Sequence, residues 1–304
     1  MWLEICILPK FVGASSVLHT TVAENSRLPY SEQVSTEVNM MHINVLTAVA
    51  IGGLGGFLLL SIASMADHDP DEPGAFSLIW QSLKGFHQRQ ARASRAVLIL
   101  GGLNIALEIA GLWLGSGVTT GTAIGLQFCT IVIGHRLFLT DGPLTGDERT
   151  PITSIFLRVF AYFLLSLLFF IVTLGVYWVA FQTTQNLALS VGLATVTGVL
   201  LTLPLAAACL IFPAAILGDL SWLVTAWKRS TPVKYSLTGA LWIVGLISLA
   251  LGIALYQVFQ DWRDTILTIP LVVMHALISI GCVSQAYLYS TQLRQTNTGR
   301  DKAR

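Results

Sequence analysis

Four polar side chains lie inside apolar stretches of the sequence, where they could do chemistry together. Glu108 and Asn104 share one stretch and lie about one helical turn apart, so they occupy the same face of a helix. Gln127 and His275 lie in two other stretches, at a depth similar to that of Glu108. If these stretches are neighbouring helices, the four residues form one buried polar cluster.

The chemistry of such a cluster would be proton transfer or cation binding. An ionisable group in hydrocarbon costs at least about 2.5–3.5 kcal/mol at a helix centre, so each one is a functional candidate. Glu108 and His275 close together would favour an ion pair, which could pass a proton or bind a cation. The alternative is packing through interhelical hydrogen bonds, each worth about 0.6 kcal/mol on average. Glu108 is the strongest candidate, because a carboxylate is costlier to bury than an amide.

Other chemistry-bearing residues give weaker signals. The acidic segment 67–73 could offer carboxylate oxygens to a divalent cation, but its ligand spacing is undefined and its two prolines favour a solvated turn. Nucleotide-binding, zinc-protease and serine-hydrolase motifs are absent from the sequence. We therefore expect no catalytic residue, no metal and no cofactor. Four widely separated cysteines are expected to be small buried apolar residues: Cys6, Cys129, Cys209 and Cys282.

Composition indicates the environment of these residues. The 304 residues are 54% apolar and only 11% charged, with a mean hydropathy of +0.71. Soluble domains carry about 25% charged residues, so lipid must be much of the solvent of this chain. This excludes a cytosolic enzyme fold, a secreted disulfide scaffold and a disordered chain. The net charge of +1 gives no sign of nucleic-acid binding.

The apolar residues form stretches long enough to cross a bilayer, which takes about 20 residues in a helix. Their continuous character favours helices over the alternating strands of a barrel. We predict an all-α, polytopic transmembrane helix bundle, in which the fifth span tilts or breaks at Pro204 or Pro213. The seven predicted spans are 44–66, 96–115, 120–139, 153–181, 186–217, 236–257 and 266–289.

The distribution of Lys and Arg predicts the orientation. With seven spans, all cationic residues except Lys10, Arg27 and Arg263 fall on one side. The positive-inside rule then places the C-terminus in the cytoplasm and the N-terminus outside. His135, Arg136 and Arg158 lie near span ends, from which they are expected to snorkel to the inner headgroups.

Two segments have the amphipathic pattern of helices that lie on the inner membrane surface. In the first, apolar residues from Phe76 to Phe86 recur at helical spacing, and the second runs from Leu220 to Arg229. Both end in cations and lead into a span, where Trp sits at headgroup level and Lys or Arg reaches lipid phosphates. The expected interfacial anchors are Trp80, Lys84, Arg89, Arg92, Arg95, Trp227, Lys228 and Arg229.

Three parts follow from these patterns. Residues 1–40 lack periodicity and are expected to be a disordered tail, or to precede the true start, because Met40 and Met41 stand directly before the first span. Residues 41–294 form the transmembrane domain. Residues 295–304 form a cytoplasmic tail.

Residues 76–294 resemble a known family. The motifs are the basic, Trp-bearing segment Phe76 to Arg95, Phe212-Pro213 with the following Gly218-Asp219-Leu220-Ser221 and Ala226 to Ser230, and Ala286 to Tyr289 with Leu293-Arg294. Together they resemble the YciC-like and glycerophosphodiester phosphodiesterase membrane-domain superfamily, although Gly218-Asp219 stands where that pattern more often has a Glu-Gly turn. The resemblance implies a six-span bacterial inner-membrane protein with no transferable catalytic residue. The first span and the tail fall outside it.

These observations predict a noncatalytic, multi-pass protein of the bacterial inner membrane, with an envelope, membrane-homeostasis or accessory role. The alternative is a small proton- or cation-coupled transporter that uses the Glu108 and His275 cluster. The expected partners are the lipid bilayer and either another membrane protein or a second copy of the chain.

The predicted orientation can be tested by cysteine labelling. Single cysteines at Arg92 and Lys228 should both react with a membrane-impermeant maleimide only after the cytoplasmic face is opened, because both residues lie in connections on the positive side. Labelling of intact and inverted membrane vesicles gives the measurement. If the two positions label from opposite faces, the predicted topology is wrong.

Overall fold

The computed structural model describes residues 52, 53, 56, 73–114, 116–142, 144, 152–219, 223–259 and 263–302. Within these ranges every regular element is a helix, which confirms the predicted all-α class. The predicted N-terminal tail, most of the first predicted span and residues 67–72 of the acidic segment lie outside the described residues.

The helices coincide with the predicted segments from residue 76 onward. Helices α3 and α9 match the two amphipathic segments, and the other helices overlap the ranges of the predicted second to seventh spans, of which the fourth to seventh are long and apolar enough to cross a membrane within the described residues. Helix α11 continues well past residue 289, so the residues predicted as a C-terminal tail extend this helix as far as Lys302. The bounds are α3 Ala75–Gln88, α4 Gln90–Leu114, α5 Ser116–Leu139, α6 Ile152–Thr184, α7 Leu187–Ala208, α8 Ile211–Ile216, α9 Leu223–Ser230, α10 Lys234–Phe259 and α11 Arg263–Lys302.

Four helical segments are long and apolar enough to cross a membrane, within the described part of the chain: Thr153–Thr184, Leu187–Ile216, Lys234–Gly252 and Ile269–Leu293. Gly125–Leu139 is a shorter apolar helix. The protein is therefore a helical membrane protein by length and composition.

The fifth span is predicted to tilt or break at Pro204 or Pro213, and the structure interrupts it at Cys209 and Leu210, just before Pro213 in α8. Proline has no N–H, so Pro213 cannot donate to the carbonyl of Cys209 four residues earlier. The N–H of Phe212 donates to that carbonyl instead, at 3.1 Å, and the chain makes a tight turn between α7 and α8. Helix α8 ends at Ile216, and Gly218 follows two residues later with a φ of 76°, in the left-handed region that glycine adopts without strain.

The chain divides into two compact units. The first comprises residues 1–62 and 168–202, and the second comprises residues 63–167 and 203–304. In the first unit, Asn186 caps the start of α7, because its Oδ1 accepts a hydrogen bond of 3.1 Å from the N–H of Leu189.

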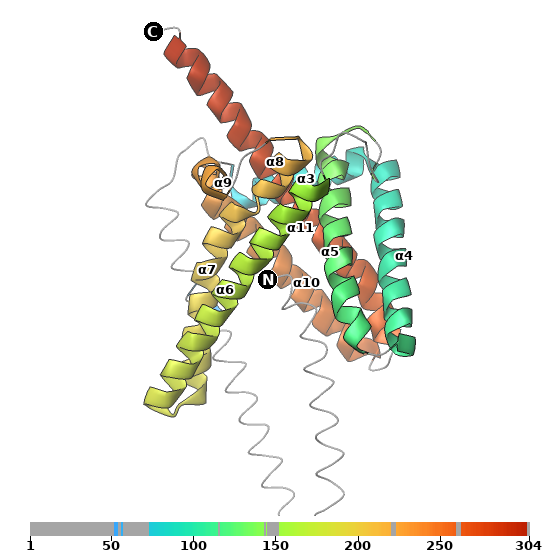
Figure 1. Cartoon of the computed structure of the whole chain (residues 1–304), viewed down its shortest axis with the longest axis vertical. Helices are drawn as coiled ribbons and strands as arrows, with labels where there is room; N and C mark the ends of the chain where they lie inside the picture. The colour runs from blue at the N-terminus through green and yellow to red at the C-terminus, as the bar shows by residue number, and fades with distance from the viewer. Residues whose placement is uncertain are drawn as a thin grey trace, which may run out of the picture. The chain divides into compact units, whose positions relative to one another are not determined.

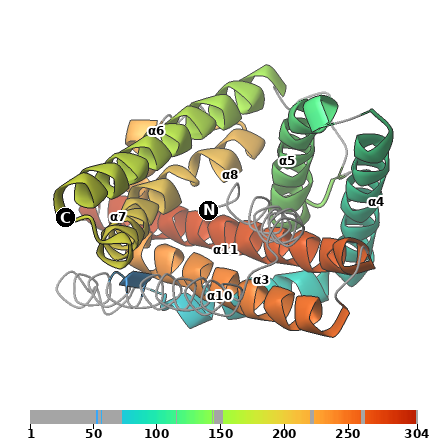
Figure 2. The same cartoon turned by 90° about the horizontal axis from the view of Figure 1, so that it is seen from below.

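Helix α11 forms the centre of the second unit. It packs against α3, α4, α5 and α10, and Figure 2 shows it between α10 on one side and α5 on the other. Helices α4 and α5 lie side by side next to it in Figure 1. Their shared core is built from residues at helical spacing: Ala93, Ala96 and Leu100 of α4, Ile133, Leu137 and Phe138 of α5, and Ile269, Val273 and Leu277 of α11.

Two glycines allow helices to approach α11 closely. A Cβ at Gly281 of α11 would overlap the Ser82 hydroxyl of α3 and lie 2.7 Å from Cζ of Phe138. Ser82 also donates a hydrogen bond of 3.0 Å to the Ile278 carbonyl. On α5, a Cβ at Gly134 would lie 2.7 Å from Cδ1 of Ile280. Small residues at such crossings are typical of membrane helix packing.

The close approach at Gly281 predicts a specific sensitivity. Gly281→Ala should destabilise the protein by about 1–3 kcal/mol, because the methyl group forces α3 and α5 away from α11. Gly101→Ala in α4 is the matched control, since a Cβ there meets nothing within 4 Å. Thermal unfolding in detergent measures both variants. Equal stability of the two would contradict the packing described here.

Candidate functional site

Two residues of the predicted cluster, His275 and Asn104, form hydrogen bonds with different groups and not with each other. His275 of α11 is 4% exposed, and its Nδ1 lies 2.8 Å from the hydroxyl of Ser248 on α10. Its ring also hydrogen-bonds the backbone of Val244. Asn104 donates to the Leu100 carbonyl of its own helix at 2.9 Å. These hydrogen bonds join His275 to α10 and leave Asn104 bonded within α4.

The other two members of the predicted cluster are Gln127 and Glu108. Gln127 of α5 is half-buried, and the side chain of Glu108 lies outside the described residues. The four-residue cluster therefore stays a prediction. The sequence reasoning missed Ser248, although a serine within an apolar span is the type of residue that could have indicated a partner for His275.

A second buried histidine joins α5 to α11. His135 is 1% exposed, and its Nδ1 lies 2.9 Å from the hydroxyl of Ser284. The Ser284 hydroxyl also lies 2.9 Å from the Ile280 carbonyl, and when it donates its single hydrogen there, Nδ1 of His135 is the donor to Ser284. In this geometry the histidine holds the serine rather than activating it as a nucleophile.

The predicted snorkelling of His135, Arg136 and Arg158 to the headgroups is wrong, because all three side chains are buried inside the protein. Arg158 of α6 is 3% exposed. Its Nη1 donates to the Ile211 carbonyl at 3.2 Å, and its Nη2 donates to the Asp219 carbonyl at 2.7 Å. These carbonyls lie at the two ends of α8. A buried guanidinium needs acceptors, and the broken helix supplies them inside the protein.

The carboxylate of Asp219 connects the end of α8 to α9 and α11. It forms an ion pair with Arg229 of α9 and accepts a hydrogen bond of 3.3 Å from the Tyr287 hydroxyl of α11. The guanidinium of Arg229 lies 6.0 Å from the centroid of the Tyr287 ring. Both charged side chains are mostly buried, at 19% exposure for Arg229 and 28% for Asp219. Arg229, predicted as a lipid anchor, thus holds a protein carboxylate.

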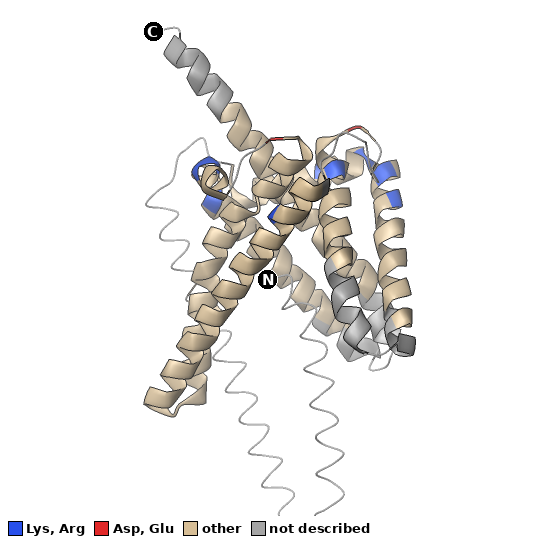
Figure 3. Cartoon of the chain, viewed as in Figure 1, with Lys and Arg blue, Asp and Glu red and all other residues tan. Residues whose placement is uncertain are grey.

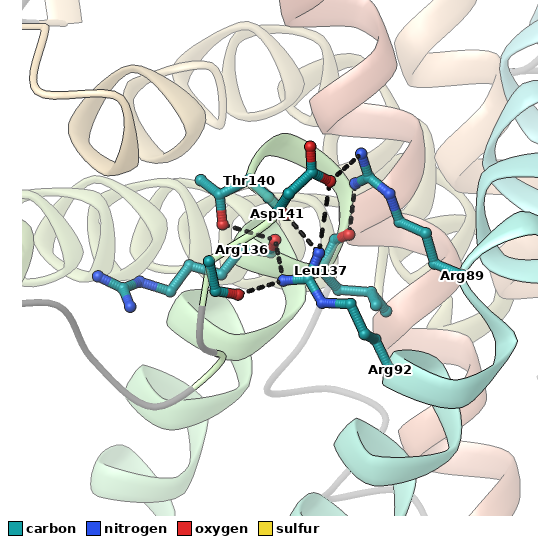
Figure 4. Close-up of polar contacts among 7 residues, drawn as sticks. Arg89, Arg92, Arg136, Leu137, Thr140 and Asp141 are labelled. Carbon is teal, nitrogen blue, oxygen red and sulfur yellow. Dashed lines mark hydrogen bonds and ion pairs between the residues drawn. The ribbon is translucent and has the colours of Figure 1, made fainter.

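A pair of arginines covers the end of α5 (Figure 4). Nη1 of Arg89 donates to the Leu137 carbonyl at 2.6 Å, and Nη2 of Arg92 donates to the Gly142 carbonyl at 2.7 Å. Both arginines approach Oδ1 of Asp141, at 3.2 and 3.8 Å respectively. The last carbonyls of a helix carry partial negative charge, which two guanidinium groups complement.

The two arginines repel each other, and each is attracted to the carboxylate of Asp141. Burial and the positive charge of Arg89 lower the pKa of Arg92, while Asp141 opposes that shift. One carboxylate is thus shared by two cations, so the corner keeps a net positive charge.

The other predicted anchors lie on exposed positions. Trp80 of α3 is 69% exposed and Trp227 of α9 is 48% exposed. Lys84, Arg95 and Lys228 are also exposed. In Figure 3 the cations at the beginning of α4 and on α9 lie toward the same end of the second unit. These positions fit a headgroup layer at that end.

The chain matches no protein-family model, and comparisons with curated proteins and with solved structures found no match either. The resemblance to the YciC-like superfamily therefore stays a prediction.

The hydrogen bonds of Arg158 predict a structural role for this residue. Arg158→Gln should lower the free energy of unfolding by about 1–3 kcal/mol, because buried carbonyls at the ends of α8 lose their donors. Arg95→Gln removes the same charge from an exposed position and is the control. Denaturation with sodium dodecyl sulfate in mixed micelles measures the difference. A fully stable Arg158→Gln protein would show that these carbonyls do not need the guanidinium.

Proposed function

We propose that the protein is a noncatalytic, multi-pass protein of the bacterial inner membrane, with an accessory or membrane-homeostasis role. One observation carries this proposal. The two buried histidines of the second unit each pair with a serine across a helix contact, His135 with Ser284 and His275 with Ser248. The first pair joins α5 to α11 by a hydrogen bond, and the second joins α10 to α11.

These pairs are suited to packing rather than to catalysis. A hydrolase needs a hydroxyl whose hydrogen is given to a base, whereas the Ser284 hydroxyl has a backbone carbonyl of its own helix within hydrogen-bond distance as an acceptor. Arg158 and Arg229 are likewise bonded to groups of the protein itself. The polar groups of this unit therefore support a scaffold, whose stability they maintain in a solvent without hydrogen-bond partners.

The proposed topology has seven spans, with the N-terminus outside and the C-terminus in the cytoplasm. The positive-inside distribution of the sequence supports it, as does the location of cations of α4 and α9 toward one end of the second unit. In this topology α3 and α9 are the two cytoplasmic interfacial helices. The likeness to the YciC-like superfamily agrees with an inner-membrane location.

A small proton- or cation-coupled transporter is the second candidate. The observation that favours it is His275, a buried titratable group on the central helix, together with Glu108 at a similar predicted depth. Keeping such groups in hydrocarbon costs enough to suggest a function beyond packing.

A flux assay separates the two candidates. The purified protein is reconstituted into liposomes that contain a pH-sensitive dye, and proton flux is followed under an imposed potential for the wild type and for Glu108→Gln. The scaffold proposal predicts the flux of protein-free liposomes in both cases. Proton flux that the wild type supports and Glu108→Gln abolishes would establish the transporter and overturn the proposal.

A matched pair of variants tests the role of His275 directly. His275→Ala and Ser248→Ala both remove the hydrogen bond between these two side chains, and His275→Ala also removes a titratable group and the hydrogen bond to the Val244 backbone. Packing predicts that Ser248→Ala lowers the free energy of unfolding by about 0.6–1.7 kcal/mol, and that His275→Ala lowers it more because two hydrogen bonds are lost. A loss of flux in His275→Ala alone, with unchanged stability, would instead favour transport.

A further inference from the structure

Helix α3 has three faces rather than the two of a simple amphipathic helix. One face lies against the bundle and is formed by Leu78, Ser82 and Gly85, of which the first two are fully buried. Ser82 hydrogen-bonds the Ile278 carbonyl of α11, so this face is fixed to the central helix. The position of α3 is therefore set by the protein.

The other two faces of α3 are exposed and differ in character. Phe76, Trp80 and Leu83 form an apolar face and are 75%, 69% and 39% exposed. At about 100° per residue, Gln81 and Lys84 fall on the polar face between the apolar face and the bundle. A helix with one face on protein, one apolar and one polar fits the boundary between acyl chains and headgroups.

The arginine pair follows directly after α3, at the same corner. The side chains of Arg89 and Arg92 are 30% and 23% exposed, so an external anion can reach them. Asp141 is 93% exposed, and a carboxylate surrounded by water neutralises two guanidiniums only weakly. Lys84 and Arg95 are exposed and form no ion pair with any part of the chain that the structure describes.

We infer that the corner between α3 and α4 binds the phosphate of an anionic phospholipid, with Arg89 and Arg92 as its guanidinium groups and Lys84, on the exposed polar face of α3, as an additional cation near the membrane surface. Nη2 of Arg89, which donates to the exposed carboxylate of Asp141, can donate to a phosphate oxygen instead. Both Nη groups of Arg92 donate to the carbonyls of Arg136, Thr140 and Gly142, so Arg92 contributes positive charge to the site. The exposed apolar face with Trp80 requires acyl chains beside the phosphate, which free phosphate does not have. This inference rests on the membrane location in the proposed function, and it does not depend on the absence of catalysis.

The geometry also assigns a role to Asp141. Its carboxylate occupies the place on Arg89 and Arg92 that a lipid phosphate would take, so the two anions compete. Removing the charge of Asp141 should therefore strengthen lipid binding, while removing a cation should weaken it.

Lipid binding by the full-length protein tests the site. The purified protein in neutral detergent is titrated with dioleoylphosphatidylglycerol or dioleoylphosphatidylcholine, and native mass spectrometry counts bound lipids. We expect preferential binding of phosphatidylglycerol, about fivefold weaker in Lys84→Gln and in Arg89→Gln and tighter in Asp141→Asn. Lys302→Gln, which removes the same charge near the end of α11, should bind within about twofold of the wild type.

Several results would overturn the inference. They are equal binding of the two lipids, unchanged binding in both Lys84→Gln and Asp141→Asn, or an equal loss in Lys302→Gln, which would indicate a general charge effect. Displacement of the lipid by millimolar inorganic phosphate would mean that free phosphate is the ligand.

The variants distinguish a loss of lipid binding from a loss of stability. Arg89→Gln also removes the hydrogen bond to Leu137, so its melting temperature is measured in parallel. Lys84→Gln and Asp141→Asn decide the outcome if that variant unfolds. Failure of lipid selectivity with no proton flux removes this inference alone, whereas flux dependent on Glu108 removes the proposed function and leaves the lipid site standing.

Discussion

Hydrocarbon offers no hydrogen-bond partner, so polar groups within this protein must find partners in the protein itself, on their own helix or on a neighbouring one. Helix α11 supplies many of them in the second unit. Ser284 on one side holds His135 of α5, and the Ile278 carbonyl on another side accepts from Ser82 of α3. Gly281 lets α3 and α5 come close enough for these contacts. The central position of α11 follows from this combination of small and polar residues.

The same constraint explains the broken helix between α7 and α8. Pro213 interrupts the backbone hydrogen bonds, and the turn after α8 leaves further carbonyls to be satisfied. Arg158 donates to carbonyls at both ends of α8, and Asp219 links that turn to Arg229 and Tyr287. The charge of Arg158 thus stabilises contacts inside the protein. Its presence in an apolar segment does not by itself indicate catalysis or transport.

Much of the helical architecture could be predicted from apolar stretches and helical spacing. The amphipathic character of α3 followed from the residues between Phe76 and Phe86. The sequence offered Pro204 and Pro213 as places for a break in the fifth span, and the structure keeps Pro204 inside α7 and interrupts the span just before Pro213. Contacts between distant segments could not be predicted in this way. Arg158 and His135 were expected at the headgroups because they lie near span ends, but the structure buries them against α8 and α11. Their partners are carbonyls and a hydroxyl, which carry no distinctive signal in the sequence.

The sequence by itself determined that this is a helical membrane protein and that its cations are unevenly distributed, because length, hydropathy and charge act locally along the chain. Only the tertiary structure decided which polar residues meet. It paired His275 with Ser248 on α10, and it gave α3 a third face through Ser82. These partners depend on how each helix is rotated about its own axis and on how closely neighbouring helices approach. Residue spacing within a single span determines neither the rotation nor the distance.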